Sequence, residues 1–202
     1  MNVGVLASGT GTNLQALLDR VHGRHEVRIV AVASDQPAAP ALERARRAEV
    51  DQGAFPTAAF ADRDARDLAM AAWLQEREVE LVALAGYGQL LSSGFLRRFP
   101  GRVINVHPAL LPAFPGNRPV QDALAYGVKV FGVTVHFVDE GMDTGSVILQ
   151  RAVELDDARE VEEVLSALHP IEYELLPRAV ELIAGGRVRP DPDHPRRILV
   201  GR

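Results

Sequence analysis

The chain of 202 residues contains no cysteine. This absence excludes disulfides, thiolate nucleophiles and cysteine-based zinc sites. No apolar stretch approaches the ~20 residues that a membrane-spanning helix needs. The N-terminus lacks the basic segment and long apolar run of a signal peptide, because Met1 leads almost at once into a short buried-type strand. We therefore expect a cytoplasmic protein.

There is also no excess of positive charge, since 22 Lys and Arg face 27 Asp and Glu and the formal net charge is −5. A general nucleic-acid surface is disfavoured by this balance. An anionic ligand would need backbone N–H groups or a few placed arginines. Hydrophobic residues make up 47% and charged residues 24%, as in ordinary soluble domains, so the chain can build a continuous core. Both a monomer and a homodimer are compatible with these numbers.

Apolar runs alternate with segments of helical spacing along most of the chain. The strands are expected at 3–7, 27–33, 80–85, 102–106, 130–138 and 146–153, with a short one near 54–55. The helices are expected at 13–21, 41–48, 63–77 and 161–183, the last bent near Pro170. This alternation predicts an α/β fold of Rossmann-like type. Its mainly parallel, twisted sheet has helices on both faces, and the strand near 146–153 is mixed or antiparallel.

Residues 1–202 are expected to form a single domain without a clear linker or internal repeat. We assign phosphate binding to its N-terminal half (about 1–100) and catalysis to its C-terminal half (about 101–185). The tail at 186–202 is rich in Pro, Asp and Arg, so we expect a loosely packed surface segment. In the 63–77 helix we place Leu68, Ala72 and Leu74 on the apolar side.

A glycine-containing turn at residues 8–13 follows the first predicted strand. Such a turn exposes backbone N–H groups, and the following helix N-terminus adds partial positive charge, so phosphate binds well there. Leu14 stands where a dinucleotide fingerprint needs a third glycine, although Asp35 follows the second strand as a ribose-binding acid would. The turn thus favours a single phosphate over NAD, and a tight turn without ligand stays open.

Asn105 and His107 stand two residues apart at the end of a predicted strand, where both side chains would share one face. Acyl transfer to an amine needs hydrogen-bond donors for the developing oxyanion and an acceptor for the amine proton. Asn105 and His107 offer the donors. Asp143 offers the acceptor, directly or through water, and an ion pair with it would favour a charged His107. A packing role for all three residues, and a structural or site-lining role for His136, stay open.

Three segments together resemble the 10-formyltetrahydrofolate-dependent formyltransferase family. They are Asn-Val-His-Pro-Ala-Leu-Leu-Pro at 105–112, Val-His-Phe-Val at 135–138 and Asp-Thr-Gly at 143–145. With the turn at 8–13 they resemble the branch that formylates glycinamide ribonucleotide in purine synthesis. The resemblance covers roughly residues 1–185. We expect no additional N-terminal or C-terminal domain of the kind found in relatives with other acceptors, so the length also favours a small substrate.

The resemblance implies a role for each matching residue. Asn105, His107 and Asp143 would be catalytic, and Asp143 would also contact the folate. Phosphate and ribonucleotide binding would fall to Gly11, Thr12, Asn13 and Glu172. Folate binding would fall to Arg63, Tyr87, Gly88, Gln89, Leu90 and Leu91. The co-substrate would be 10-formyltetrahydrofolate, without a metal, and the partners would be small molecules rather than nucleic acid or membrane.

The sequence departs from the family pattern at two places. Residues 117–121 read Asn-Arg-Pro-Val-Gln, where the family often has histidine. Tyr173 stands where a histidine usually follows Glu172. Two alternatives to formyl transfer also stay open at this point. One is hydrolysis of formyltetrahydrofolate by the same three residues, and the other is a nucleotide-binding module without chemistry.

Overall fold

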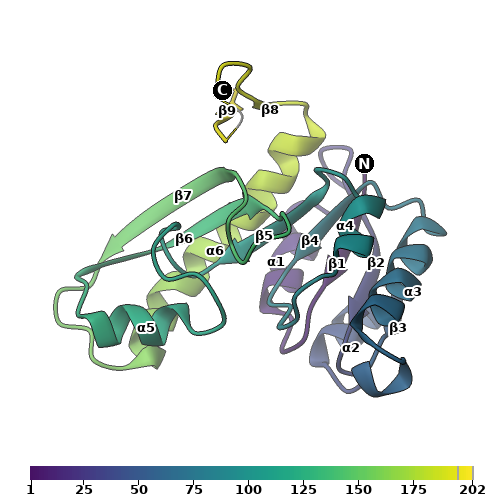
Figure 1. Cartoon of the computed structure of the whole chain (residues 1–202), viewed down its shortest axis with the longest axis horizontal. Coiled ribbons are helices and arrows are strands. Elements are labelled where there is room, and N and C mark those ends of the chain that lie inside the picture. The colour runs from purple at the N-terminus through teal and green to yellow at the C-terminus, as the bar shows by residue number, and fades with distance from the viewer. Residues whose placement is uncertain (195, 202) are drawn as a thin grey trace. The chain divides into compact units, whose positions relative to one another are not determined.

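The computed structural model describes residues 1–194 and 196–201. The chain divides into two compact units, a first unit of Met1–Ile104 and a second unit that begins at Asn105. Figure 1 shows the helices and strands of each. The assignment of phosphate binding to one half of the chain and catalysis to the other stays a prediction.

The first unit is built on four parallel strands. They are β1 (Asn2–Leu6), β2 (Arg28–Ser34), β3 (Asp51–Ala54) and β4 (Leu81–Leu84). Their order is β3-β2-β1-β4, and every pairing among them is parallel. All of β4 and all but the first residue of β1 are buried, as is typical of parallel strands covered on both faces. The carboxyl ends of β1, β2 and β4 therefore lie at one edge of the sheet.

Helices connect these strands and supply the rest of the core of the first unit (Figure 1). They are α1 (Thr12–Arg20), α2 (Pro40–Arg47), α3 (Arg63–Gln75) and α4 (Ser93–Arg98), with a 3-10 turn η1 at Thr57–Ala59. The start of α3 is fixed by Asp62, whose carboxylate accepts the N–H of Ala65 at 2.8 Å. Pro40 opens α2 at a position where its missing N–H costs nothing.

The inward face of α3 differs from the one that the sequence predicted. Leu74 is buried as expected, but Leu68 is 40% exposed and Ala72 is also exposed. The reason is a buried ion pair of neighbouring residues, in which Arg66 Nη2 lies 2.8 Å from Asp67 Oδ1. Because these two charges satisfy each other, they occupy the face that an apolar pattern would assign to leucine.

The second unit contains the antiparallel part of the fold. Its strands are β5 (Val103–His107, which starts in the last residues of the first unit), β6 (Val130–Phe137), β7 (Val147–Glu154), β8 (Val188–Pro190) and β9 (Ile198–Val200). β6 and β7 pair antiparallel, which confirms the prediction for residues 146–153. The helices are α5 (Pro119–Tyr126) and α6 (Val161–Ala184), and α6 runs along β6 and β7 with Pro170 and Pro177 inside it (Figure 1).

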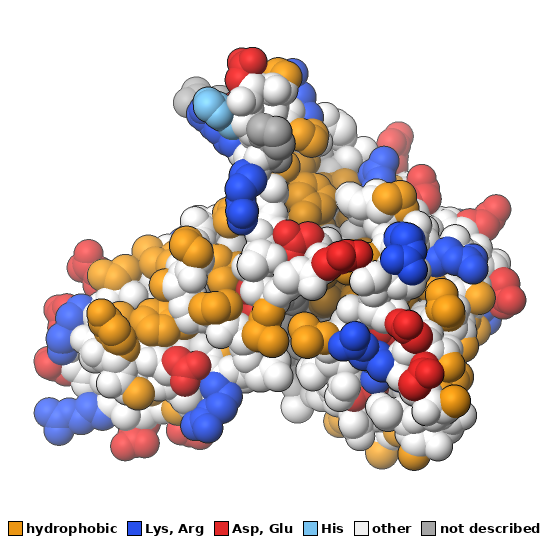
Figure 2. Space-filling view, viewed as in Figure 1, with side chains coloured by type: hydrophobic (Ala, Val, Ile, Leu, Met, Phe, Trp, Pro, Cys, Tyr) orange, Lys and Arg blue, Asp and Glu red, His pale blue; other side chains and the backbone are white. Residues whose placement is uncertain are grey.

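The predicted fold class is confirmed, because a mainly parallel sheet with helices is joined by an antiparallel strand pair. The predicted loose tail contains a small sheet of its own, since β8 and β9 pair antiparallel. Figure 2 shows acidic and basic side chains interspersed on the visible face, with hydrophobic side chains gathered over the region of β7 and α5. No helix in residues 1–194 and 196–201 is long and apolar enough to cross a membrane.

We predict that Asp67→Ala lowers the free energy of unfolding by about 3–5 kcal/mol, because it leaves Arg66 as an uncompensated buried charge. It also removes the acceptor of the Ser92 backbone N–H. Urea unfolding followed by circular dichroism measures the change. Asp64→Ala is the matched control on the exposed side of the same helix, and its effect should stay below about 1 kcal/mol. Equal effects of the two substitutions would contradict the prediction.

Candidate active site

The end of β5 brings Asn105 and His107 against a common carboxylate in the second unit. Asn105 Nδ2 lies 3.5 Å from Asp143 Oδ1, and His107 Nδ1 lies 3.6 Å from Asp143 Oδ2. His107 is 4% exposed, whereas Asn105 is half-buried. The three residues that the sequence singled out therefore form one cluster, although they come from two segments of the chain.

Asp143 is held in this position by its own backbone conformation and by a hydrogen bond from the loop at Gly116. Its φ of 53° lies in the left-handed region, which is uncommon for a residue with a side chain. The Gly116 N–H donates to Asp143 Oδ2 at 2.8 Å. Gly145 passes so near the chain that a Cβ there would lie 1.7 Å from the Phe137 carbonyl oxygen, so only glycine fits. Local strain of this kind gathers at functional sites, where surrounding contacts maintain it.

His136 from β6 is the fourth member of the cluster. Its Nε2 lies 3.5 Å from Asp143 Oδ1 and 3.2 Å from Asn105 Nδ2. Its Nδ1 lies 2.8 Å from the Phe137 carbonyl oxygen, and a carbonyl only accepts, so Nδ1 carries a hydrogen. In the neutral ring, Nε2 then accepts from the Asn105 amide. The side chain is 1% exposed and contacts the cluster, so of the two roles left open for His136, the structure favours lining the candidate site.

A hydrogen bond fixes the orientation of the His107 ring, and burial disfavours its charged form. Its Nε2–H donates to the Phe114 carbonyl at 2.9 Å. Burial lowers the pKa of His107, and His136 lowers it further. The hydrogen bond to the Phe114 carbonyl and the charge of Asp143 act in the opposite direction and raise this pKa. The pKa ends below the ordinary value of 6.5, so the ring is neutral at pH 7. Asp143 does favour the imidazolium, as the sequence suggested, but burial outweighs this attraction.

Asp143 keeps its charge in the same surroundings. Burial raises the pKa of its carboxyl, but the contact with His136, the hydrogen bond from the Gly116 N–H and the attraction of His107 lower it. The pKa of Asp143 ends below the ordinary value of 3.8. The cluster thus combines an ionised acceptor with a neutral imidazole and an amide, which suits proton removal from an amine and stabilisation of an oxyanion.

The glycine turn of the first unit lies between β1 and α1. Gly11 precedes α1 with a φ of 73°, and a Cβ at this position would lie 2.8 Å from Ala41 Cα. The Ala41 N–H also donates to the Gly9 carbonyl at 3.2 Å. The turn is therefore packed against the start of α2. Substitution of Gly11 would disturb folding as well as any bound ligand.

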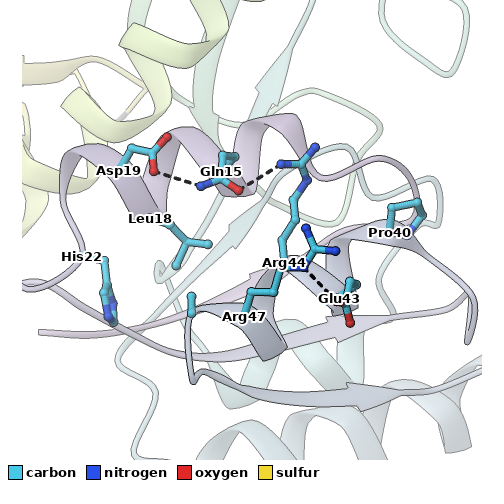
Figure 3. Close-up of a pocket in the computed structure, with 9 residues that line it drawn as sticks. Gln15, Leu18, Asp19, His22, Pro40, Glu43, Arg44 and Arg47 are labelled. Carbon is cyan, nitrogen blue, oxygen red and sulfur yellow. Dashed lines mark hydrogen bonds and ion pairs between the residues drawn. The ribbon is translucent and has the colours of Figure 1, made fainter.

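An open groove of about 570 Å³ lies between α1 and α2, and Arg44 extends through it toward the turn (Figure 3). Arg44 Nε donates to the Thr10 carbonyl at 2.8 Å, and Nη1 donates to Gln15 Oε1 at 2.9 Å. Gln15 in turn donates to Asp19 at 2.9 Å (Figure 3). Arg44 was not predicted as a site residue, because the thirty-odd residues between it and the turn hide this contact in the sequence.

The sequence profile described as formyl transferase matches residues 1–180. The chain belongs to the formyl transferase family. Phosphoribosylglycinamide formyltransferase of Bacillus subtilis is 38% identical over 182 residues, which cover 90% of this chain and 93% of that protein. The protein of the same name from Mycobacterium tuberculosis is 46% identical over 180 residues, covering 89% of this chain and 83% of that one.

A solved structure shares the formyl transferase fold over the whole chain. Glycinamide ribonucleotide transformylase 1 from Symbiobacterium toebii superposes with a TM-score of 0.95 at 45% identity, covering 100% of this chain and 94% of that one. The predicted family is thereby confirmed. The matched residues 1–180 contain both the glycine turn and the Asp143 cluster.

The other predicted site residues of this formyl transferase lie at several places. Glu172 is buried on α6. Tyr173, which stands where the family usually has histidine, stacks on His169 with ring centroids 5.9 Å apart. Arg63 is exposed at the start of α3. The divergent segment 117–121 is partly helical, because α5 begins at Pro119. These residues keep their predicted roles as predictions.

The predicted folate segment lies at the carboxyl end of β4 in the first unit. Leu90 is 49% exposed, and Tyr87 carries a buried hydroxyl that has no hydrogen-bond partner among the residues that the structure describes. Burial raises the pKa of this hydroxyl above its ordinary value of 10.0. A buried phenol without a partner is costly, so a ligand that supplies one would gain affinity.

We predict that the free energy of unfolding falls as the pH drops below about 6.5. The unfolded chain binds a proton at the ordinary histidine pKa, whereas folded His107 binds it only at lower pH, so acidification favours unfolding in this window. Asp143 adds a second loss below about pH 4, because its folded pKa is also lowered. Urea unfolding between pH 7.5 and 5 measures the first slope.

His107→Gln is the matched variant for this slope, because it removes the titrating ring and keeps a hydrogen-bonding side chain. Its stability should depend less on pH between 7.5 and 5 than that of the wild type. The same slope in both proteins would show that His107 does not titrate as described.

Proposed function

We propose that this formyl transferase moves the formyl group of 10-formyltetrahydrofolate to the amino group of glycinamide ribonucleotide in purine synthesis. The observation that carries the proposal is the cluster in which Asn105, His107 and His136 surround the ionised Asp143. The names of the relatives favour this acceptor. They favour transfer over hydrolysis and over a binding module without chemistry.

The reaction is direct attack of the amine nitrogen on the formyl carbon. A new C–N bond forms, and the carbonyl electron pair moves to the oxygen. The amine proton goes to the Asp143 carboxylate, directly or through water. The lowered pKa of Asp143 keeps this carboxylate ionised and able to accept the proton. When the carbonyl re-forms, the bond from carbon to the folate nitrogen breaks, and that nitrogen takes the proton that Asp143 received, directly or through water, which restores the carboxylate. No covalent enzyme intermediate is needed, which agrees with the absence of cysteine.

Asn105 and His107 stabilise the oxyanion in this scheme. The Asn105 amide gives up its long contact of 3.5 Å to Asp143 most easily, and the freed N–H turns to the formyl oxygen. His107 is neutral before the reaction because of burial. Negative charge that develops on the formyl oxygen favours the protonated imidazole, and the proton that His107 Nδ1 takes is the amine proton, passed on by Asp143 Oδ2 at 3.6 Å. Burial thus keeps His107 ready to respond to the charge of the intermediate.

The remaining proposed contacts follow the family pattern. Gly11, Thr12 and Asn13 hold the phosphate, and Glu172 holds the ribose or glycinamide part. The folate lies against Arg63 and the segment 87–91, and Asp143 also contacts it. We propose that no metal takes part, that the partners are small molecules and not nucleic acid, and that the enzyme works in the cytoplasm.

We predict that His107→Ala and Asp143→Asn each lower kcat about 10²–10³-fold, the usual effect of removing a group that stabilises the transition state. The assay mixes purified protein with 10-formyltetrahydrofolate and glycinamide ribonucleotide and follows both the formylated product and free formate. Urea unfolding checks that each variant folds. Turnover near the wild-type value would exclude the substituted residue from catalysis, and release of formate without product would replace transfer by hydrolysis.

We predict that Arg44→Ala raises the KM for glycinamide ribonucleotide about tenfold, because loss of its hydrogen bonds loosens the turn at Thr10. The KM for the folate and the value of kcat should change little. Arg47→Ala is the matched control, since Arg47 lines the same groove but pairs with Glu43. If Arg44→Ala leaves the ribonucleotide KM unchanged, the turn does not hold the phosphate in the way proposed.

A further inference from the structure

A buried carboxylate in the first unit joins the glycine turn to the predicted folate segment. Asp35 follows β2 directly and is 4% exposed. Its Oδ1 accepts the Ser8 hydroxyl at 2.5 Å. Its Oδ2 accepts Nε2–H of Gln89 at 3.3 Å and of Gln36 at 3.1 Å. Both oxygens are engaged by this chain, so Asp35 is not the free ribose-binding acid that a dinucleotide site needs.

Ser8 connects Asp35 to the segment that follows β4. Its hydroxyl oxygen accepts the Gly88 N–H at 2.9 Å while its hydrogen goes to Asp35. The Ser8 N–H donates to the Gly86 carbonyl at 3.0 Å. The segments after β1, β2 and β4 are thus tied together at the edge where these neighbouring strands end. Ser8 is the residue directly before the glycine turn.

The charge of Asp35 gives this network its strength. A hydrogen bond from a hydroxyl to a carboxylate at 2.5 Å is of the short, charge-assisted kind, which is about twice as strong as a neutral one. The hydroxyl hydrogen can point to only one acceptor. Asp35 therefore fixes the Ser8 hydroxyl so that its lone pair faces the Gly88 N–H.

We propose that Asp35 is a positioning residue that holds the phosphate turn and the folate segment 87–91 in register through Ser8. It touches neither substrate. This inference rests on the proposed function, because that function assigns one substrate to each segment. It predicts that loss of the Asp35 charge weakens the binding of both substrates together, although each segment keeps its own contacts.

Asp35→Asn tests the proposal. The amide has one acceptor oxygen in place of two, and its NH₂ faces either the Ser8 hydroxyl or the Gln89 amide donor. We expect the dissociation constants of tetrahydrofolate and of glycinamide ribonucleotide, each titrated alone by calorimetry, to rise about tenfold, as loss of a charge-assisted hydrogen bond suggests. Hydrogen exchange of the Gly88 amide, which is measured without substrate, should become faster. The value of kcat at saturation should change little.

Matched variants separate this role from a loss of folding. Asp51→Asn changes an exposed aspartate of β3 and should leave both dissociation constants unchanged. Ser8→Ala should resemble Asp35→Asn, and Ser8→Thr, which keeps the hydroxyl, should restore tight binding. The double variant of Ser8→Ala with Asp35→Asn should lose no more affinity than the single variant that binds less tightly, because both substitutions act through one connection.

The outcomes distinguish this inference from the proposed function. If the active wild type and Asp35→Asn bind both ligands equally well, or if only one ligand weakens, the joint positioning role is wrong. Unchanged exchange at Gly88 would overturn it as well. If the wild type transfers no formyl group, the proposed function fails on its own, whatever the result of the binding and exchange measurements.

Discussion

The carboxylate of Asp143 holds the proposed catalytic cluster together. Two histidines and one amide lie within 3.6 Å of its oxygens, and one backbone N–H donates to it at 2.8 Å. An ionised carboxylate in a half-buried site is stable only with such partners. The contacts that keep Asp143 charged also fix the neighbouring donors, so removing its charge would disorder the whole cluster as well as remove a proton acceptor.

Burial opposes this electrostatic attraction at His107 and wins. A charged imidazole would satisfy both the Phe114 carbonyl and Asp143, but the cost of removing the cation from water exceeds that gain, and the pKa falls. Resting His107 therefore provides no positive charge to match the negative charge of Asp143. In the proposed reaction, the proton that moves to Asp143 cancels this charge while a new one forms on the formyl oxygen. The net charge of the buried cluster stays constant, which avoids a second desolvation cost.

The sequence predicted those features that depend on local pattern. The strand ends, the glycine turn and the resemblance around Asn105, His107 and Asp143 were visible in short segments, and the fold class and family are confirmed. Features that depend on distant partners were not visible. Arg66 and Asp67 bury together on the face assigned to Leu68 because η1 and Ser92 supply further partners. The protonation of His107 depends on burial, which no short pattern reveals.

Asp35 shows why a motif match needs the third dimension. An acid after the second strand fits a ribose-binding role by sequence, and the missing third glycine at Leu14 was the only local argument against it. The structure instead directs both oxygens at Ser8, Gln36 and Gln89. These donors satisfy both oxygens within the chain itself. A parallel sheet gathers the ends of distant strands at one edge, and a buried acid at that edge can align two binding segments without touching either ligand.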